Sequence, residues 1–392
     1  MNQEIDTVAL AAARVRQMPT SAIHEMTRLS KALDDVAFLS WAKPTSGFPS
    51  HIAQAAIQAI EEGKTGGYSE PAGLMALREH IAGKLREVNH IEATADEIIV
   101  TVGAIEGLAA AILALVDPGD EVLIPVPGYP THLRLVEMAS GRPVCVPTIE
   151  EEGFCLDMEK MRAAITPRTK AILYSDPNNP TGSVYSRDQL QALADLACEH
   201  NLMVITDEAY EHFTFDGCVH HSIASFPGMR ERVISAFTFT KTYAMTGWRV
   251  GYVQASAAWM ASIKKAHIPL AICAPVVSQY AALKALTSSQ ECVAEFREHY
   301  RVARDLMCER LDGLSEVFSY HKPQGSYLMF PRIRLEGGAD SLSFAKNLLQ
   351  QTRVSTTPGV AFGMESHLRM SFCVPENMIQ KAFDRMEAYF KA

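Results

Sequence analysis

The sequence predicts an α/β protein with a mostly parallel, seven-stranded sheet sandwiched by helices, joined to a smaller α+β domain. Three observations support this. Short β-type runs alternate with amphipathic stretches between about residues 96 and 255, as in right-handed βαβ units. After about residue 286 a long helical stretch is followed by several short strands. Residues of distinctive chemistry follow the strand candidates, at the edge where such sheets bind ligands.

The strands of the sheet are predicted by seven apolar runs bounded by turn residues. These runs are Glu97–Thr101, Glu121–Ile124, Val144–Pro147, Ala171–Tyr174, Met203–Thr206, Val233–Phe237 and Val250–Val253. Amphipathic periodicity between them predicts helices, for example over Ile105–Val116, Tyr129–Ala139 and Arg187–Glu199.

The C-terminal part follows a different pattern, and we predict three regions from it. Residues 1–45 form an arm that packs with the small domain, 46–285 a large domain and 286–392 a small α+β domain. Because no polar linker marks the boundary near residue 285, we expect a continuous helix to cross it. The small-domain elements predicted are a helix over Cys292–Leu311, strands near Val317–Tyr320, Tyr327–Phe330, Arg353–Thr356 and Leu368–Phe372, and a helix over Glu376–Tyr389.

Bulk composition excludes some classes of protein. The net charge of −9 argues against nonspecific nucleic-acid binding, which needs a basic surface. The eight cysteines form no CxxC pair, which favours reduced thiols in the cytoplasm. Glu4 and Asp6 stand where a signal peptide would be basic. The longest apolar stretch (98–116) is interrupted by Glu106, so we expect buried core rather than a membrane span.

The most informative segment is Thr238-Phe239-Thr240-Lys241-Thr242, with Arg249 eight positions beyond the lysine. A lysine amine after a strand can form an imine with a carbonyl compound. The neighbouring hydroxyls and the arginine suit a phosphate group. Together these residues suggest a lysine-bound pyridoxal phosphate, although the segment alone also fits a solvated lysine after a strand.

Two further motifs accompany this segment: Asp176-Pro177-Asn178-Asn179-Pro180-Thr181-Gly182 and Asp207-Glu208-Ala209-Tyr210. In order and spacing, over nearly the whole chain, the three blocks resemble those of class I/II aminotransferases, the fold-type-I pyridoxal-phosphate enzymes of the aspartate aminotransferase superfamily. Asn178 to Gly182 alone would fit an ordinary turn.

The resemblance implies roles for five residues. Lys241 resembles the Schiff-base lysine, which also moves a proton between the substrate α-carbon and the cofactor. Asp207 resembles the carboxylate that keeps the pyridine nitrogen protonated, so that the ring accepts electrons; a helix cap or salt bridge is the alternative. Asn179 and Tyr210 resemble donors to the ring oxygen O3′. Tyr129 resembles the aromatic that stacks on the ring, and a core tyrosine is the alternative.

The phosphate cradle is implied at the start of a helix, where backbone N–H groups suit a dianion. The corresponding positions are Gly103, Ala104, Ile105, Thr238, Thr240 and Arg249. Tyr68 resembles a tyrosine that reaches the phosphate of the neighbouring subunit, so the resemblance implies a homodimer with shared active sites. It implies no metal ion.

Substrate contacts are implied for Arg369 and Asn179. A planar guanidinium binds an α-carboxylate bidentately. One departure concerns Ala42-Lys43, where the family often has Gly-Glu. Trp41, Ala42 and Phe48 would then shape an altered substrate pocket, unless the change is neutral drift.

The activity implied is transfer of an amino group from an L-amino acid to a 2-oxo acid, by a ping-pong mechanism through pyridoxamine phosphate. We expect a neutral or aromatic side chain, because no second arginine is evident; Arg134 and Arg142 fit surface charges better. A β-lyase, cyclising synthase or oxidase would use the same residues. A transcription regulator with an aminotransferase-like domain would need an N-terminal DNA-binding domain, and only about 45 residues precede the large domain.

Overall fold

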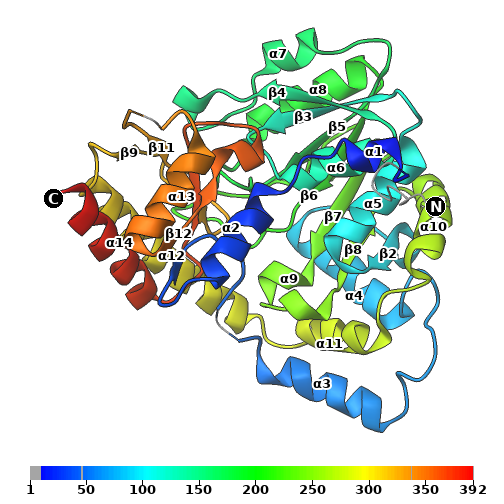
Figure 1. The fold of residues 1–392 in the computed structure, drawn as a ribbon. Helices are drawn as coiled ribbons and strands as arrows, with labels where there is room; N and C mark the ends of the chain where they lie inside the picture. Colours follow the sequence, from blue (N-terminus) through cyan, green and yellow to red (C-terminus); the bar gives the residue numbers. More distant parts are fainter. Residues whose placement is uncertain (1–9, 46, 337, 392) are drawn as a thin grey trace, which may run out of the picture.

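The computed structural model describes residues 10–45, 47–336 and 338–391, and its main feature is a seven-stranded sheet (Figure 1). The strand order is β2-β8-β7-β6-β5-β3-β4. β8 runs antiparallel to both neighbours and every other pairing is parallel, which confirms the predicted fold class. The strands are β2 (Ile98–Thr101), β3 (Glu121–Val126), β4 (Arg142–Pro147), β5 (Thr169–Ser175), β6 (Met203–Asp207), β7 (Val233–Thr238) and β8 (Gly251–Gln254).

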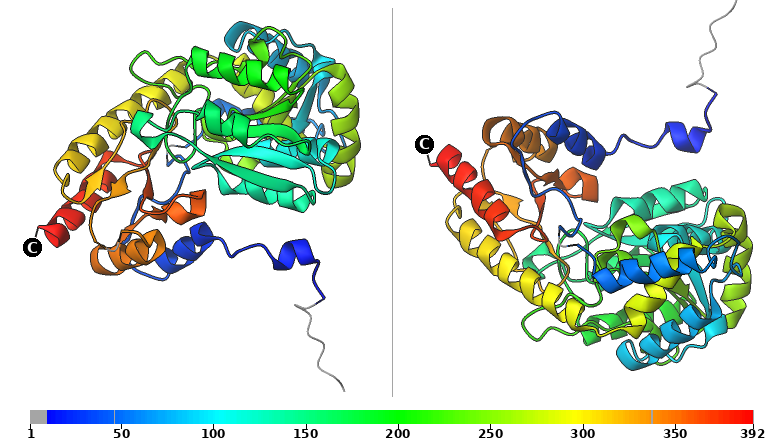
Figure 2. Two further views of the ribbon diagram at one scale, coloured as in Figure 1. Left: turned by 90° about the horizontal axis from the view of Figure 1, so that it is seen from above. Right: turned by 90° about the horizontal axis from the view of Figure 1, so that it is seen from below.

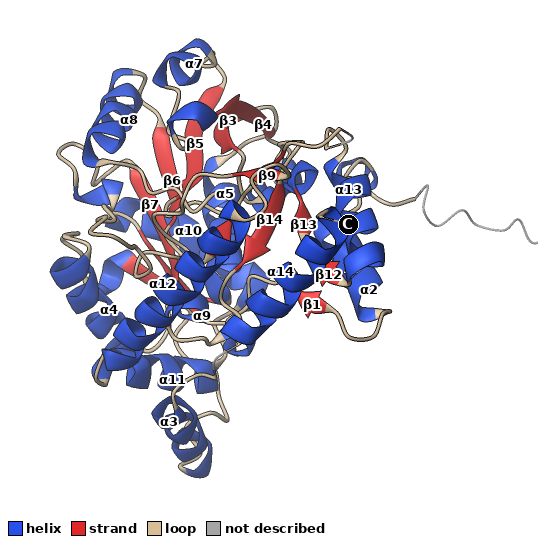
Figure 3. Cartoon of the chain, turned by 90° about the vertical axis from the view of Figure 1, so that its left-hand side faces the viewer, coloured by secondary structure: helices blue, strands red, loops and turns tan. Residues whose placement is uncertain are grey.

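Helices cover both faces of this sheet (Figure 3). Ile98 and Val100 point to one face and Ile99 to the other, because side chains alternate along a strand. The first face packs against α3 (Ser50–Glu61), α4 (Met75–Val88), α7 (Met158–Ala163), α8 (Arg187–Glu199) and α11 (Val276–Thr287). The second packs against α5 (Gly103–Leu115), α6 (Pro130–Met138) and α10 (Ala257–Ala271).

Several element boundaries differ from the prediction. The helix expected over Ile105–Val116 begins at Gly103, and the strand expected over Val250–Val253 is Gly251–Gln254. Helix α11 has no sequence counterpart among the predicted helices, because it packs against both α3 and α4 and its apolar residues show little helical periodicity.

Small sheets and helices from the C-terminal part lie beside the large sheet. The sheets are β10-β14-β13, β11-β9 and β1-β12. Their strands are β1 (Ala37–Phe38), β9 (Phe318–Ser319), β10 (Leu328–Met329), β11 (Arg332–Ile333), β12 (Val354–Ser355), β13 (Thr357–Pro358) and β14 (Leu368–Ser371). The accompanying helices are α2 (Ala22–Lys31) from the N-terminal arm, α12 (Glu291–Asp312), α13 (Ser341–Thr352) and α14 (Glu376–Phe390), whereas α1 (Ala13–Arg16) contacts α6 beside the large sheet.

The beginning of the chain lies against its end. β1 pairs in parallel with β12, and α2 packs against α13. In Figure 2 the blue helix α2 accordingly lies beside the orange C-terminal segments. The domain boundaries predicted after residues 45 and 285 stay predictions. Within the described ranges, no helix combines the length and apolar character needed to cross a bilayer.

A helix does run across residue 285, because α11 spans Val276–Thr287, but it does not continue into the C-terminal part. α11 ends at Thr287, Ser288 is extended, and the Gln290 side chain donates to the carbonyl of Ala285 (3.0 Å). The helix that does run from one apolar cluster to the other is α12. Its Val293 belongs to the cluster beneath the large sheet and its Tyr300 to the cluster of the C-terminal sheets.

Candidate active site

A cavity of about 550 Å³ opens where the carboxyl ends of the parallel strands meet the C-terminal sheets. Asp207 ends β6, Lys241 lies in the short helix α9 (Phe239–Thr242) directly after β7, and Arg369 lies on β14. The cavity brings together most of the predicted residues: Trp41, Ala42, Ala104, Ile105, Tyr129, Asn179, Asp207, Tyr210, Thr238, Thr240, Lys241, Arg249 and Arg369. These residues are far apart in sequence, so only the fold makes them one site.

Lys241 presents its amine at the floor of this cavity. Its Nζ donates to the carbonyl oxygen of Ala42 (2.8 Å), and no described carboxylate lies within ion-pair distance. Burial lowers the pKa of Lys241 to about 8. An unpaired ammonium is costly to bury, so about half of this amine is neutral and nucleophilic near pH 8.

Asp207 is held in place by a residue that the sequence reading missed. The buried His132 places Nε2 3.1 Å from Asp207 Oδ2, and the backbone N–H of Ala209 donates to Oδ1 (3.3 Å). His132 lies one turn along α6 from Tyr129, and the two rings meet edge to face at 5.5 Å. The three-residue spacing from Tyr129 was the available signal, since residues i and i+3 share a helix face.

Arg369 is a buried guanidinium without an anionic partner among the described residues. It donates to Asn179 Oδ1 (3.2 Å), to the carbonyl of Ser40 (2.8 Å) and weakly to Thr357 Oγ1 (3.4 Å). Its Nε has no hydrogen-bond partner within the described part of the chain. Neutral acceptors do not balance a buried charge, so the geometry leaves this cation ready for a carboxylate.

Tyr210 and Asn179 flank the same space. Tyr210 is buried, and burial raises the pKa of its phenol well above the ordinary value, so the group stays a hydrogen-bond donor. Because Asn179 accepts from Arg369 through Oδ1, its amide N–H groups are left to donate elsewhere. Both are therefore suited to an oxygen that carries partial negative charge.

A second cationic group closes over the start of α5. Arg249 donates to the carbonyl of Thr246 (3.2 Å) and makes no ion pair with a described residue. A Cβ on Gly103, which has φ of +71°, would lie 2.4 Å from its Nη2, so only glycine lets the guanidinium approach the helix N-terminus. Gly103 thus shapes the cradle although it does not line the cavity.

These residues fit pyridoxal phosphate. The Oγ1 of Thr240 is buried and has no hydrogen-bond partner among the described residues. Thr240 lines the cavity together with Arg249 and with Ala104 and Ile105 of the first turn of α5, where backbone N–H groups suit a phosphate. Asp207 suits a protonated ring nitrogen, and Lys241 suits the aldehyde. The orphaned hydroxyl is otherwise an unexplained cost of folding.

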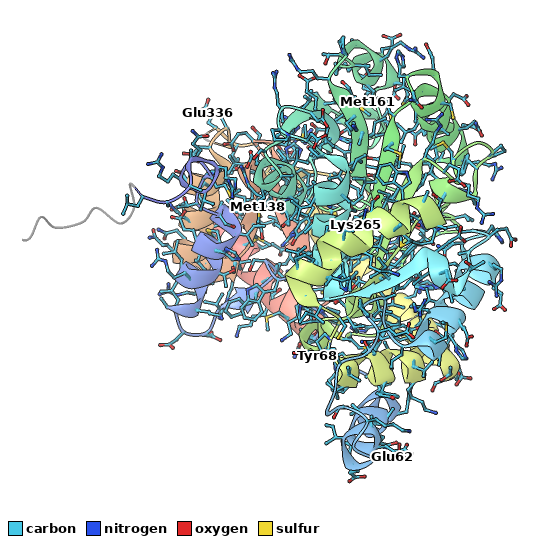
Figure 4. The ribbon with its side chains drawn as sticks, turned by 90° about the vertical axis from the view of Figure 1, so that its right-hand side faces the viewer. Glu62, Tyr68, Met138, Met161, Lys265 and Glu336 are labelled. Carbon is cyan, nitrogen blue, oxygen red and sulfur yellow. The ribbon has the colours of Figure 1, made fainter. Side chains whose placement is uncertain are left out.

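Two predicted residues lie elsewhere. Tyr68 is 81% exposed and lies at the surface (Figure 4), outside the cavity of its own chain. Phe48 packs edge to face on Trp248 at 5.3 Å and lines a neighbouring cavity instead. Arg134 forms an ion pair with Glu137 (2.6 Å) and Arg142 with Glu121 (3.3 Å), both outside the site. This agrees with the expectation that both arginines are surface charges.

The arm contributes wall residues that had no sequence signal. Ile23, Thr27 and Lys31 of α2 line the cavity one helical turn apart, and Lys43 lies at its rim. Their spacing fits any amphipathic helix. The pairing of β1 with β12 places α2 beside the cavity, and only this tertiary contact shows that α2 contributes to the wall.

Comparison with known proteins agrees with this geometry. The family model for class I and II aminotransferases matches residues 38–386. An aspartate aminotransferase from Pyrococcus abyssi is 40% identical over 374 residues, which cover 94% of this chain and 95% of the relative. Aromatic-amino-acid aminotransferase 2 from Thermococcus litoralis is 36% identical over 385 residues, covering 96% and 97%. The structure of Thermus thermophilus aspartate aminotransferase with maleate superposes with a TM-score of 0.90 at 35% identity, covering 96% and 99%.

Proposed function

The chain belongs to the class I and II aminotransferase family, and on that premise we propose that it binds pyridoxal phosphate covalently at Lys241 and transaminates an L-amino acid with a neutral or aromatic side chain. The observation that carries the proposal is that Lys241, Arg249 and Arg369 line one cavity and none of them has an ion-pair partner among the described residues. Arg369 lacks an anion and Lys241 lacks a carboxylate, so the site is complete only with anionic ligands.

The cofactor, when bound, supplies an aldehyde that condenses with amines and a ring that withdraws electrons from the substrate α-carbon. Arg369 holds the substrate α-carboxylate and thereby orients the Cα–H bond. Lys241, about half neutral near pH 8, carries a proton to and from that carbon. Asp207, oriented by His132, keeps the ring nitrogen protonated.

The side-chain preference rests on the cavity wall. Ile23, Trp41 and Ile105 present apolar surface, and within the described part of the chain no third arginine lines the site besides Arg249 and Arg369. Lys31 and Lys43 favour a second candidate, an acidic side chain. The Lys31 ammonium lies 5.6 Å from the Trp41 ring, and Lys43 makes no ion pair with a described residue. The two relatives named above cover both candidates, since one is an aspartate aminotransferase and the other an aromatic-amino-acid aminotransferase.

A homodimer with shared sites is part of the proposal. Tyr68 supports it, because an aromatic residue that is 81% exposed at a Gly-rich turn is a candidate for burial by a second copy. Subunit mixing tests this: Lys241→Ala and Tyr68→Ala proteins, each impaired alone, should recover part of the activity when mixed. A fully active monomer by light scattering would contradict it.

We further propose that the protein works in the cytoplasm. All eight cysteines are free thiols, and two of them, Cys145 and Cys198, are exposed, which suits a reducing compartment. Fractionation of the native host, with the enzyme followed by antibody, tests the location.

The central test combines trapping with a donor panel. Borohydride reduction of the holoenzyme and peptide mapping should place the cofactor on Lys241, and a label on another lysine would refute the assignment. Aspartate, alanine, leucine, phenylalanine and arginine are then compared as donors with 2-oxoglutarate or pyruvate. Highest kcat/KM with aspartate would select the acidic candidate. Release of ammonia or a cyclic product in place of an oxo acid would replace transamination by lyase or synthase chemistry.

A further inference from the structure

A buried histidine lies behind the cavity, between two carboxylates that flank site residues. His220 places Nδ1 2.9 Å from Asp176 Oδ2 and Nε2 2.9 Å from Glu208 Oε2. The exposed fractions are 7% for the histidine side chain and 2% for each carboxylate side chain. His220 does not line the cavity, and nothing in the proposed reaction uses it.

Both ring nitrogens face acceptors, so both must carry protons for both contacts to be hydrogen bonds. Burial alone would lower the pKa of His220, but the bonds to Asp176 and Glu208 outweigh it and raise the pKa to about 10. The remaining oxygens are also satisfied. Asp176 Oδ1 accepts from the backbone N–H of Tyr185 (2.9 Å), and Glu208 accepts from Thr206 Oγ1 (2.7 Å) and from Ser222.

The two carboxylates belong to the two segments that carry the cofactor ring contacts. Asp176 lies three residues before Asn179, and Glu208 directly follows Asp207. The paired part of β5 and β6 ends at Ser175 and Asp207, so beyond that point few ladder bonds hold the two segments together. His220 spans this gap from a third segment, the loop after β6.

We propose that His220 is a positioning residue, which through Asp176 and Glu208 fixes the spacing between the Asn179 loop and the end of β6, and so sets how Asn179 and Asp207 meet the cofactor ring. The inference rests on the proposed function for its cofactor. It goes beyond that function because His220 touches neither cofactor nor substrate.

The test compares His220→Gln and Asp176→Asn with a matched control, Arg304→Gln. Arg304 is fully buried and also binds two carboxylates, Asp216 (2.9 Å) and Asp305 (2.8 Å), but it lies on α12 away from the cavity. For each protein we measure the apo-protein Tm, the pH midpoint of the lysine-bound cofactor absorbance, and kcat and KM.

We expect both bridge variants to raise the pH midpoint by about one unit, because a displaced Asn179 amide stabilises the ring oxygen less. We expect kcat to fall on the order of ten- to a hundredfold, with a smaller change in KM. Arg304→Gln should lower Tm alone. A His220→Gln protein that loses Tm but keeps the wild-type midpoint and kcat would overturn the proposal, as would an equal midpoint shift in Arg304→Gln.

A measurement on the wild type covers the case in which the bridge variants do not fold. Nitrogen NMR of histidine-labelled apo-protein should show the His220 ring protonated on both nitrogens at pH 8.5, where exposed histidines are neutral. The signal must be assigned to His220 by residue, because the ring nitrogens of His267 and His367 also each face two acceptors. A neutral ring would overturn the bridge. Absence of lysine-bound cofactor in the wild type would refute the proposed function instead, and leaves the NMR result standing.

Discussion

Two partly buried lysines near β7, one over its Phe237 ring and one in the short helix that follows it, have opposite surroundings. Lys84 of α4 places Nζ 2.5 Å from both carboxylate oxygens of Glu211 and 2.8 Å from Asn89 Oδ1, above the Phe237 ring at 4.7 Å. The Nζ of Lys241 donates a hydrogen bond to the carbonyl oxygen of Ala42 and has no carboxylate partner among the described residues. Both are largely shielded from water, but only Lys84 has a compensating charge.

The difference between the two lysines indicates where the reactive groups of this protein lie. Around Lys84, Glu211 and Asn89 each polar group has a partner, as a structural network should. In the cavity, Thr240 Oγ1 and Arg369 Nε have none, and Lys241 lacks an anion. Unsatisfied buried groups cost stability, so the two that line this cavity, beside an amine without an anion, mark a place where a ligand would complete the structure.

The largest effect should come from removing the two lysines in turn. Lys241→Ala should abolish transamination, by at least about 10⁴-fold, because the amine both holds the cofactor and moves the proton. Its folding stability should change little, since no ion pair is broken. Lys84→Ala should show the reverse: a loss of about 3–5 kcal/mol from the unpaired Glu211, with cofactor trapping retained. Steady-state rates and urea unfolding measure both, and equal stability losses would break the comparison.

The next effect concerns the carboxylate beneath the ring. Asp207→Ala should lower kcat on the order of 10³-fold, because the ring nitrogen loses the charge that keeps it protonated. Asp207→Glu should retain part of the activity. His132→Gln, which removes only the orienting contact, serves as the graded control. Single-turnover kinetics measure these three rates. Near-native turnover in Asp207→Ala would disprove the proposed role of Asp207 in keeping the ring nitrogen protonated.

Arg369→Gln should act on substrate rather than on cofactor. Loss of the charged contact to the α-carboxylate is expected to lower kcat/KM by about 10²-fold or more, a cost of about 3 kcal/mol. The cofactor should still be trapped on Lys241, and stability should hold or rise, since a buried unbalanced charge is removed. If KM stayed constant for all amino acids, the carboxylate would bind elsewhere.

The smallest effect is a pH dependence of stability from the paired region. Although burial opposes it, the charge of Lys84 lowers the pKa of Glu211 to about 2. A depressed carboxyl pKa stabilises the fold above its unfolded value near 4.5 and loses that contribution as pH falls toward 2, a span on the order of 3 kcal/mol. Urea unfolding between pH 5 and 3 should therefore show a shallower slope in Glu211→Gln than in the wild type. Equal slopes in Glu211→Gln and the wild type would contradict the contribution assigned to Glu211.

Much of the fold and of the site could be predicted because it depends on local patterns. The strand runs alternate with helices, and this determined the parallel sheet. The blocks around Asn179, Asp207 and Lys241 lie directly after strands, whose carboxyl ends must meet at one edge. Lys241 is the best example, since its position after β7 already implied a place in that edge.

What only the tertiary structure decided are the contacts between segments remote in sequence. Whether Lys241 is paired or unpaired, and why Lys84 is the opposite, cannot be read from either lysine's neighbours, because Glu211 lies 127 residues from Lys84. The same holds for His132 under Asp207, for α2 in the cavity wall and for His220 between two carboxylates. Periodicity in the sequence indicates which face of an element is apolar. The partner of a buried polar group depends on three-dimensional packing, and the presence or absence of that partner distinguishes a structural charge from a catalytic one.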